Sequence, residues 1–244
     1  VRYPRLAEAV ASGPTGGLLG GKFISEFLDR PNMICWDLGC TTCDVGLIAG
    51  GLLPVNKSPE FAAHKVRMPM IAIDCLGAGC SHVVKADAAS GRITIGPESV
   101  RADLGTMYVS DEVTIGDIDL TLGYVNPDYY LGGTIQVNRE RAKEELSKRV
   151  AEPLGQDEYD VSLKILDLLH DKVVNHINGI MLSKGLNPAE FSLLVHGAAG
   201  PLHLWGVERG IHFQEVLVVP CSAVFSSFGV AAADYFHRYD KAVT

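Results

Sequence analysis

The sequence predicts an α/β domain. Short apolar runs bounded by turn residues alternate along the chain with longer segments of helical periodicity, a pattern typical of strands that alternate with helices. Hydrophobic residues make up 47% of the 244 positions, which is enough for a substantial buried core. Two turns rich in small residues, far apart in the chain, each follow a predicted strand. We therefore expect one large domain whose turns carry the function.

The N-terminal part predicts a helix followed by a hairpin. Residues 12–17 (Ser-Gly-Pro-Thr-Gly-Gly) form a dense turn signal. Apolar residues recur at helical spacing over 18–28, and Pro31 ends that helix. Residues 32–37 and 45–48 are short apolar runs separated by a tight polar turn, so we expect two strands there.

The middle of the chain predicts extended structure and then short segments. Residues 66–73 are apolar and extended, and 81–95 alternate like a hairpin that turns at Ser90 and Gly91. Residues 96–135 are short-segmented and rich in glycine and aspartate.

The C-terminal part returns to strands and helices. We expect a charged helix over 138–150 ended by Pro153, a helix over 161–183, strands at 193–195 and 216–219, and a last helix over 224–233 that follows a Cys221–Ser222 cap. His170 and His176 are expected to be surface or capping residues of their helix.

Charge and composition exclude several classes of function. The net charge is -8 and the 21 lysines and arginines are scattered, so neither a nucleic acid nor an anionic membrane is expected as partner. No apolar run approaches the roughly 18 residues of a membrane span, and no secretory signal is present, so we expect a cytoplasmic protein with six reduced cysteines. Because the chain starts at Val1, we interpret it as part of a longer polypeptide.

The first candidate site is the turn between the two N-terminal strands, which reads Asp-Leu-Gly-Cys-Thr-Thr-Cys-Asp-Val over 37–45. Successive backbone N–H groups in such a turn can bind phosphate oxygens, and threonine hydroxyls add donors. Asp37 and Asp44 suit a hydrated magnesium ion or an oriented water molecule. The expected phosphate contacts are Gly39, Cys40, Thr41 and Thr42. The alternative is a simple hairpin with a polar tip.

The second candidate site is the turn that follows the strand at 193–195. A strand, small residues and a helix start let the backbone approach a flat ligand closely. The alternative is an ordinary turn that needs glycine only for its backbone conformation, and a structural hydrogen-bonding role for the histidine. The expected contacts are His196, Gly197, Ala198, Ala199, Gly200 and Pro201.

Two further groups carry weaker signals. Asp74, Gly77 and Gly79 are candidates for substrate contact, although a carboxylate that caps its own turn explains Asp74 equally well. Cys40 and Cys43 have the spacing of a metal or redox pair, but a single pair supplies only two ligands.

Six motifs in order resemble the hydantoinase A, 5-oxoprolinase and acetone/acetophenone carboxylase family. Its Ser-Gly-Pro-x-Gly-Gly and Asp-Met-Gly-Gly-Thr-Ser-x-Asp-Val stretches are similar to 12–17 and 37–45. The remaining similarities are Gly77 to Ser81, Leu122 to Gly133, His196 to Pro201 and Phe225 to Gly229. The turn at 37–45 also resembles the phosphate-2 motif of actin-like ATPases, and 196–201 their adenosine motif.

The resemblance implies the second, ribonuclease-H-like lobe of an actin-like ATPase: a mixed sheet flanked by helices over 1–244, with a small inserted subdomain near 85–135. It also implies ATP, Mg²⁺, a small-molecule substrate and a complex with a hydantoinase B-type subunit. The preferred function is the ATP-binding part of a ketone carboxylase that activates bicarbonate, a ketone enol or both by phosphorylation. An ATP-dependent hydrolase of hydantoins or 5-oxoproline is the alternative. Cys40 and Cys80, which replace family glycines, favour a third possibility, a non-catalytic structural lobe.

Overall fold

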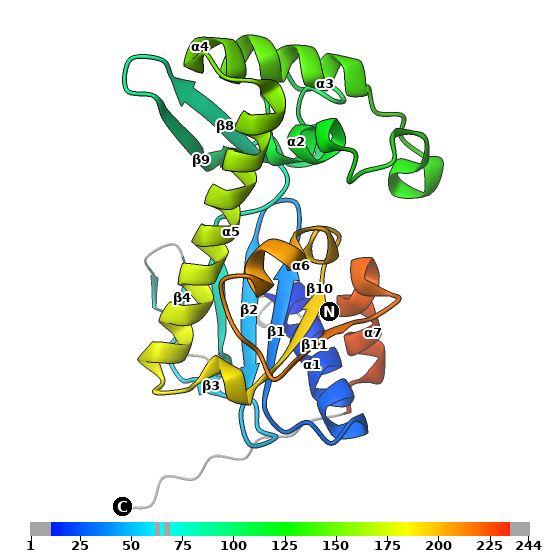
Figure 1. Cartoon of the computed structure of the whole chain (residues 1–244). Helices are drawn as coiled ribbons and strands as arrows, with labels where there is room; N and C mark the ends of the chain where they lie inside the picture. The colour runs from blue at the N-terminus through cyan, green and yellow to red at the C-terminus, as the bar shows by residue number, and fades with distance from the viewer. Residues whose placement is uncertain (1–10, 62–63, 66–68, 235–244) are drawn as a thin grey trace, which may run out of the picture.

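The computed structural model describes residues 11–61, 64–65 and 69–234. A body built around a five-stranded sheet carries a smaller group of elements at one end, and the long helix α5 (Glu158–Ser183) runs along both parts (Figure 1). None of the helices in the described part is both long and apolar enough to span a bilayer.

The central sheet is mixed, in the order β11-β10-β1-β2-β7. Strands β1 and β2 form an antiparallel hairpin, and β7 pairs antiparallel with β2. On the other side β10 pairs parallel with β1, and β11 parallel with β10. The bounds are β1 (Met33–Leu38), β2 (Cys43–Ile48), β7 (Ile73–Leu76), β10 (Ser192–His196) and β11 (Glu215–Val218). The predicted fold class, a mixed sheet flanked by helices, is confirmed.

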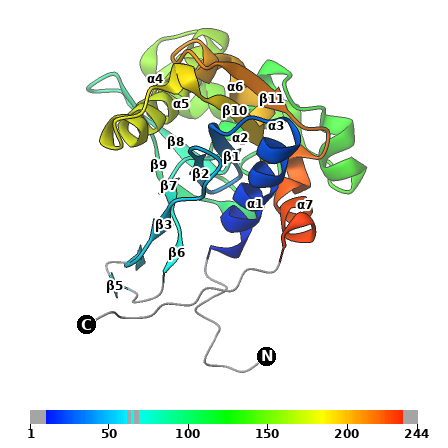
Figure 2. The same cartoon turned by 90° about the horizontal axis from the view of Figure 1, so that it is seen from below.

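Helices cover both faces of the sheet, which explains why its central strands β1, β2 and β10 are buried along almost their whole length. Met33 and Cys35 of β1 pack with Leu18 and Phe225, from α1 (Ser12–Phe27) and α7 (Phe225–Ala232). The alternate β1 residue Trp36 joins the main core, to which α5 and α6 (Gly200–Glu208) contribute. Figure 2, a view from below, shows α1 and α7 on one side of the sheet and α5 and α6 on the other.

Helix α1 begins six residues earlier than predicted, because the glycine-rich segment 12–17 is helical rather than a turn. Apart from Leu18, its buried face is made of small residues, and a Cβ added at Gly16 would lie 2.5 Å from the Ser226 carbonyl oxygen. The expected apolar face is the outer one: Phe23 is 43% and Phe27 76% exposed. These glycines therefore allow α1 and α7 to cross in close contact, which turn statistics do not reveal.

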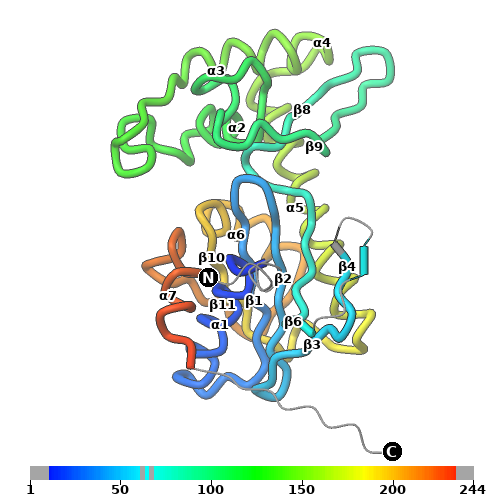
Figure 3. Tube along the Cα trace, turned by 180° about the vertical axis from the view of Figure 1, so that it is seen from behind, coloured from blue at the N-terminus to red at the C-terminus, as the bar shows by residue number. Residues whose placement is uncertain are grey.

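A second group of elements lies at the far end of α5 and has a small core of its own (Figure 3). The predicted hairpin is confirmed as β8 (His82–Asp87) and β9 (Arg92–Ser99). The other elements are η2 (Arg101–Asp103), α2 (Ile115–Leu122), η3 (Pro127–Gly133), α3 (Arg139–Leu146), η4 (Ser147–Ala151) and α4 (Glu152–Leu154). The inserted subdomain expected near 85–135 stays a proposal; the elements at this end run from β8 to α4.

One buried carboxylate organises this end of the molecule. Asp117 accepts hydrogen bonds from the backbone N–H and hydroxyl of both Thr106 and Thr114, and from the Met107 N–H, at 2.6–3.1 Å. With Thr114 it forms the capping box of α2. This Thr-x-x-Asp signature precedes an apolar run and so could have been predicted from the sequence as a helix start.

Two helix ends differ from the prediction. The helix expected to stop at 150 continues to Leu154, because the backbone widens into a π-helical segment at 147–151 just before Pro153. The last helix begins at Phe225 with Val224 as its N-cap, and no side chain caps it, so the Cys221–Ser222 cap is wrong.

The remaining short elements join these parts. They are β3 (Val55–Asn56) with β6 (Met70–Ile71), β4 (Glu60–Phe61) with β5 (His64–Lys65), η5 (Pro188–Glu190) and η6 (Ser222–Val224). The extended stretch predicted over 66–73 becomes β6 and the start of β7, while residues 66–68 lie outside the described part.

The packing of α1 on α7 gives a stability prediction. A Cβ at Gly229 would lie 1.9 Å from the Gly16 carbonyl oxygen, so Gly229→Ala must push the helices apart and is expected to cost about 1–3 kcal/mol. In the matched control Gly179→Ala, a helical glycine with no neighbouring atom within 4 Å, about 0.4–1 kcal/mol of stabilisation is expected. Urea unfolding measures both. Equal stability of the two variants would contradict the close crossing.

Candidate functional site

The tip of the β1–β2 hairpin presents unused backbone donors to solvent. The Gly39 N–H donates to the Thr42 carbonyl at 3.0 Å and closes the turn. Cys40, Thr41 and Thr42 are exposed. The backbone N–H groups of Cys40 and Thr41 donate no hydrogen bond to any of the described residues. The tip can therefore bind an anion through its backbone.

The parallel pairing of β1 with β10 places the second predicted turn beside the first. Asp37 is the register partner of His196, and the Ala199 N–H donates to the Leu38 carbonyl at 3.0 Å. Gly197 has a φ of 84°, and a Cβ there would lie 2.3 Å from Asp37 Oδ1. Glycine is thus required both for its backbone conformation and for the close approach of the two turns.

The two predicted aspartates face His196 across a small cavity. The Asp37 Oδ2 lies 3.4 Å from the His196 Nδ1, but the angles do not make a hydrogen bond, so this nitrogen has no partner. The Asp44 Oδ2 accepts from the Thr42 hydroxyl at 3.0 Å, whereas its Oδ1 is buried without a partner. All three side chains line a cavity of about 10 Å³, close to the volume that one water molecule needs.

Burial dominates the electrostatics of Asp44. It raises the pKa of this carboxyl above its usual value, and hydrogen bonds from Cys75 and Thr42 partly offset the effect. A bound cation would favour the charged form instead, because opposite charge nearby lowers a carboxyl pKa. The two carboxylates supply oxygen donors of the kind that Mg²⁺ prefers, and the small cavity between them has room for one bridging water molecule, for which the buried Asp44 Oδ1 is a free acceptor.

The third predicted group supports the hairpin tip. Ser81 donates to the Cys40 carbonyl through its N–H at 2.8 Å and through its hydroxyl at 2.7 Å. A Cβ at Gly79 would lie 2.4 Å from the same oxygen, so glycine serves the contact between the turns. Asp74 and Gly77 are exposed and line neither this cavity nor the larger one described next.

A larger cavity of about 310 Å³ opens between the two turns and the group of elements that runs from β8 to α4. Cys40 of the first turn and Ala198 and Ala199 of the second line it together, so the turns share one crevice. The volume lies in the range of small-molecule sites. Pro201 lines an adjoining open depression, and Gly200 is buried against Val195. The other lining residues are Cys80, Met107, Gly116, Asp119, Tyr124, Val125, Asn126, Tyr129, Tyr130, Leu131, Leu202 and Ala223.

Cys40 and Cys80, the two cysteines expected to stand in place of glycines, cause no backbone strain. Neither Cys40 nor Cys80 has a positive φ, so glycine is not required at either position for conformation. Cys43, by contrast, is buried in β2, where it accepts from the Trp36 Nε1–H at 3.2 Å and burial raises its pKa to about 12. Cys40 is exposed, so the two cysteines of the predicted pair lie in different environments.

Sequence reasoning missed a buried polar cluster beside the larger cavity. Cys80, Asp119 and His203 converge there, and His170 contacts His203 at 3.2 Å. The predicted surface position of His170 is wrong: the side chain is 3% exposed, and burial with the neighbouring His203 lowers its pKa to about 3. These residues come from separate elements, and no short motif joins them.

Comparison with known proteins establishes the family. Residues 3–239 match the Hydantoinase/oxoprolinase family, so the chain belongs to it. It is 35% identical to the acetone carboxylase beta subunit of Xanthobacter autotrophicus, over 98% of this chain and 34% of that protein. It is 29% identical to the caprolactamase subunit alpha of Pseudomonas jessenii, over 100% of this chain and 35% of that protein.

Solved structures support the same relationship. A nucleotide-free acetone carboxylase structure superposes with a TM-score of 0.92 at 35% identity, covering 99% of this chain and 34% of that chain. The ATP-dependent caprolactamase from Pseudomonas jessenii superposes with a TM-score of 0.78 at 29% identity, covering 90% and 31%. This chain therefore spans about a third of the length of the relatives that it matches. The predicted family is confirmed.

The raised pKa of Asp44 gives a pH prediction. An aspartate with a raised folded-state pKa gives its full stability below the usual value of 3.8 and loses it as the pH rises through the folded-state value. Asp44→Asn stays neutral and keeps an oxygen for Thr42, so we expect it to melt above the wild type at pH 7. The difference should vanish near pH 3. Thermal melts across this range measure it.

Asp74→Asn is the matched control, since it removes the same charge from an exposed position. It is expected to melt like the wild type at every pH. A destabilised Asp44→Asn at pH 7 would show that the ionised carboxylate stabilises the fold.

Proposed function

We propose that this chain is the ATP-binding part of an ATP-dependent enzyme of the carboxylase and amide-hydrolase group. The observation that carries the proposal is the shared crevice: parallel pairing of β1 and β10 brings the turns 39–42 and 196–201 to one cavity. The phosphates would lie on the free N–H groups and hydroxyls of the first turn, and the adenosine against the second. Relatives named as ATP-dependent support this assignment.

Asp37 and Asp44, which line the small cavity beside β1, would hold Mg²⁺ through water, with the unpartnered Asp44 Oδ1 as acceptor for a bridging water molecule. The ion would neutralise phosphate charge during phosphoryl transfer. The His196 Nδ1 lies 3.4 Å from the Asp37 Oδ2, so the second turn begins directly beside this carboxylate. Gly77 and Gly79 would contribute to substrate binding indirectly, through the turn that supports Cys40. Asp74 would contact the substrate from the edge strand β7.

Within this group we favour a ketone carboxylase of the acetone/acetophenone type. The acetone carboxylase beta subunit matches with higher identity than the caprolactamase subunit, and its structure superposes more closely. ATP would supply the phosphoryl group that activates bicarbonate or a ketone enol. The acetophenone carboxylase gamma subunit of Aromatoleum aromaticum, 28% identical over 94% of this chain and 32% of that protein, supports the same choice.

An ATP-dependent cyclic-amide hydrolase is the second candidate, supported by the match to caprolactamase. We also propose that the protein works in a complex with a hydantoinase B-type subunit. The names of the relatives as beta, gamma and alpha subunits support this assembly.

Filling the crevice should weaken nucleotide binding. Ala198 is exposed and lines the larger cavity, so Ala198→Trp places an indole where the adenosine is proposed to lie. Calorimetry with ATP and Mg²⁺ is expected to show at least a tenfold weaker affinity, about 1.4 kcal/mol. Leu182→Trp, at a position 81% exposed on α5, is the control and should bind like the wild type. Unchanged binding by Ala198→Trp would place the nucleotide elsewhere.

Substrate dependence separates the candidate functions. We expect the complete protein with its partner subunits to turn over ATP when bicarbonate and a ketone are both present, and to form a 3-oxo acid. Turnover stimulated by a lactam, hydantoin or 5-oxoproline without bicarbonate would identify the hydrolase instead. If calorimetry detects no binding of ATP in the presence of Mg²⁺, the remaining possibility is the non-catalytic structural lobe.

A further inference from the structure

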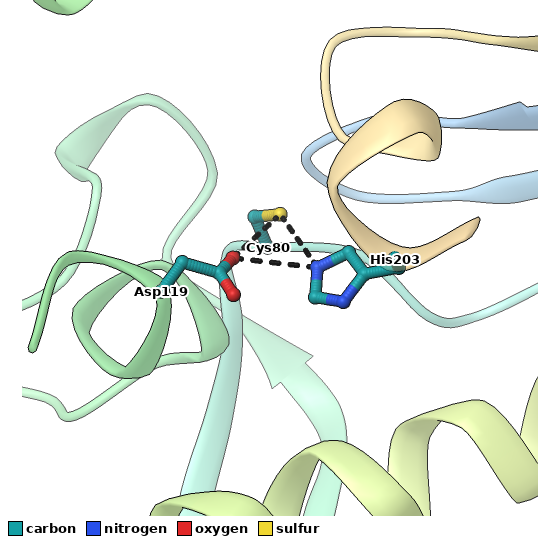
Figure 4. Close-up of side chains that lie close together, drawn as sticks. All are labelled: Cys80, Asp119 and His203. Atoms are coloured by element: carbon teal, nitrogen blue, oxygen red, sulfur yellow. Dashed lines mark hydrogen bonds and ion pairs between the residues drawn. The ribbon is translucent and has the colours of Figure 1, made fainter. Parts of the chain in front are cut away.

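We propose that Cys80, Asp119 and His203 form a zinc-type metal site, separate from the proposed magnesium position. The three side chains converge from different elements: Cys80 from the turn between β7 and β8, Asp119 from α2 and His203 from α6 (Figure 4). Among the residues that the structure describes, they are the one group of three or more potential ligands that meets in this way.

The distances match the edges of a metal tetrahedron. Zinc bonds of about 2.3 Å to sulfur and about 2.0–2.2 Å to nitrogen and oxygen put neighbouring tetrahedral ligands roughly 3.3–3.7 Å apart. The His203 Nε2 lies 3.3 Å from Asp119 Oδ2, and the Cys80 Sγ lies 3.6 Å from the same oxygen. The Sγ-to-Nε2 distance is 4.0 Å, so one edge needs to shorten by only a few tenths of an ångström.

The arrangement does not fit a nucleophile–base–acid triad. In such a triad the cysteine and the carboxylate face opposite nitrogens of the imidazole, so that the carboxylate orients the ring. Here both Cys80 and Asp119 approach the same nitrogen, the Nε2 of His203. One ring proton cannot serve both, whereas one cation contacts all three ligand atoms at once.

The surroundings of the three side chains also fit a bound metal ion. Asp119 is 1% exposed, and its Oδ1 has no hydrogen-bond partner. The far nitrogen of His203, Nδ1, lies 3.2 Å from the Nε2 of His170. A metal-bound histidine usually donates its other N–H to such an acceptor, which fixes the tautomer that leaves Nε2 free for the ion.

The donor set selects the ion. A thiolate and an imidazole are ligands of zinc and of similar transition metals, while magnesium and calcium take oxygen donors. Binding displaces the Cys80 thiol proton to solvent, so two negative ligands balance a divalent cation. Three protein ligands leave a fourth position for water or a substrate oxygen, as in catalytic zinc sites. Cys80 and Asp119 both line the cavity of about 310 Å³, from which that position can be reached.

Cobalt titration tests the site without nucleotide. The purified protein, stripped with a chelator, is expected to bind one Co²⁺ with a thiolate charge-transfer band, and zinc should abolish the band by displacement. Cys80→Ser should lose the band, and Asp119→Asn and His203→Gln should bind at least a hundredfold more weakly. His170→Gln, which removes the supporting acceptor, should weaken binding about 10–100-fold. Cys221→Ser, a thiol outside the cluster, is the matched control and should keep the band.

Circular dichroism of each metal-free variant checks that it folds, so that loss of binding reflects the ligand. Substoichiometric Co²⁺, a charge-transfer band that survives in Cys80→Ser, or displacement of Co²⁺ by Mg²⁺ as readily as by zinc would overturn the proposal. The result is independent of ATP binding, so the metal site and the nucleotide site can fail separately.

Discussion

The parallel pairing of β1 with β10 is the constraint on which the rest of the site depends. Its register puts Asp37 beside His196, and the turns that follow the two strands then share a hydrogen bond between Ala199 and Leu38. Backbone pairing thus brings residues that are far apart in the chain together at the carboxyl ends of these two strands. The burial of both faces sets the register of these strands. A one-residue shift in the pairing of β1 with β10 would therefore disrupt the core and also separate the two turns.

Close approach is the second constraint, and glycine provides it. Gly17 leaves room for the His196 ring, since a Cβ there would lie 2.5 Å from its Cε1. Gly197 does the same for Asp37, and Gly79 for the Cys40 carbonyl. The helix α1 therefore acts on the site although it contributes no polar contact to it: its small face lets His196 stay buried at the end of β10.

Sequence patterns predicted those elements whose structure depends mainly on neighbouring residues in the chain. The central strands, the β8–β9 hairpin and α5 follow from periodicity and turn residues, and the turns at 37–45 and 196–201 were recognisable by composition. Patterns failed where distant packing decides. The glycines of α1 appeared to be a turn because their role is contact with α7, and His170 appeared to be on the surface because its partner, His203, lies on another helix. Asp119 carried no local signal.

The small cavity beside β1 and the larger cavity beside α2 offer different chemistry, and this difference follows from one residue. Near β1 the donors are carboxylate oxygens, which suit a hard, hydrated cation beside phosphate. Near α2 the thiol of Cys80 changes the set to sulfur, nitrogen and oxygen. A glycine at that position would leave Asp119 and His203 as a two-ligand pair, too few for a closed coordination sphere. The same substitution that weakens the resemblance at 77–81 therefore completes the ligand set, without backbone strain and within reach of the cavity.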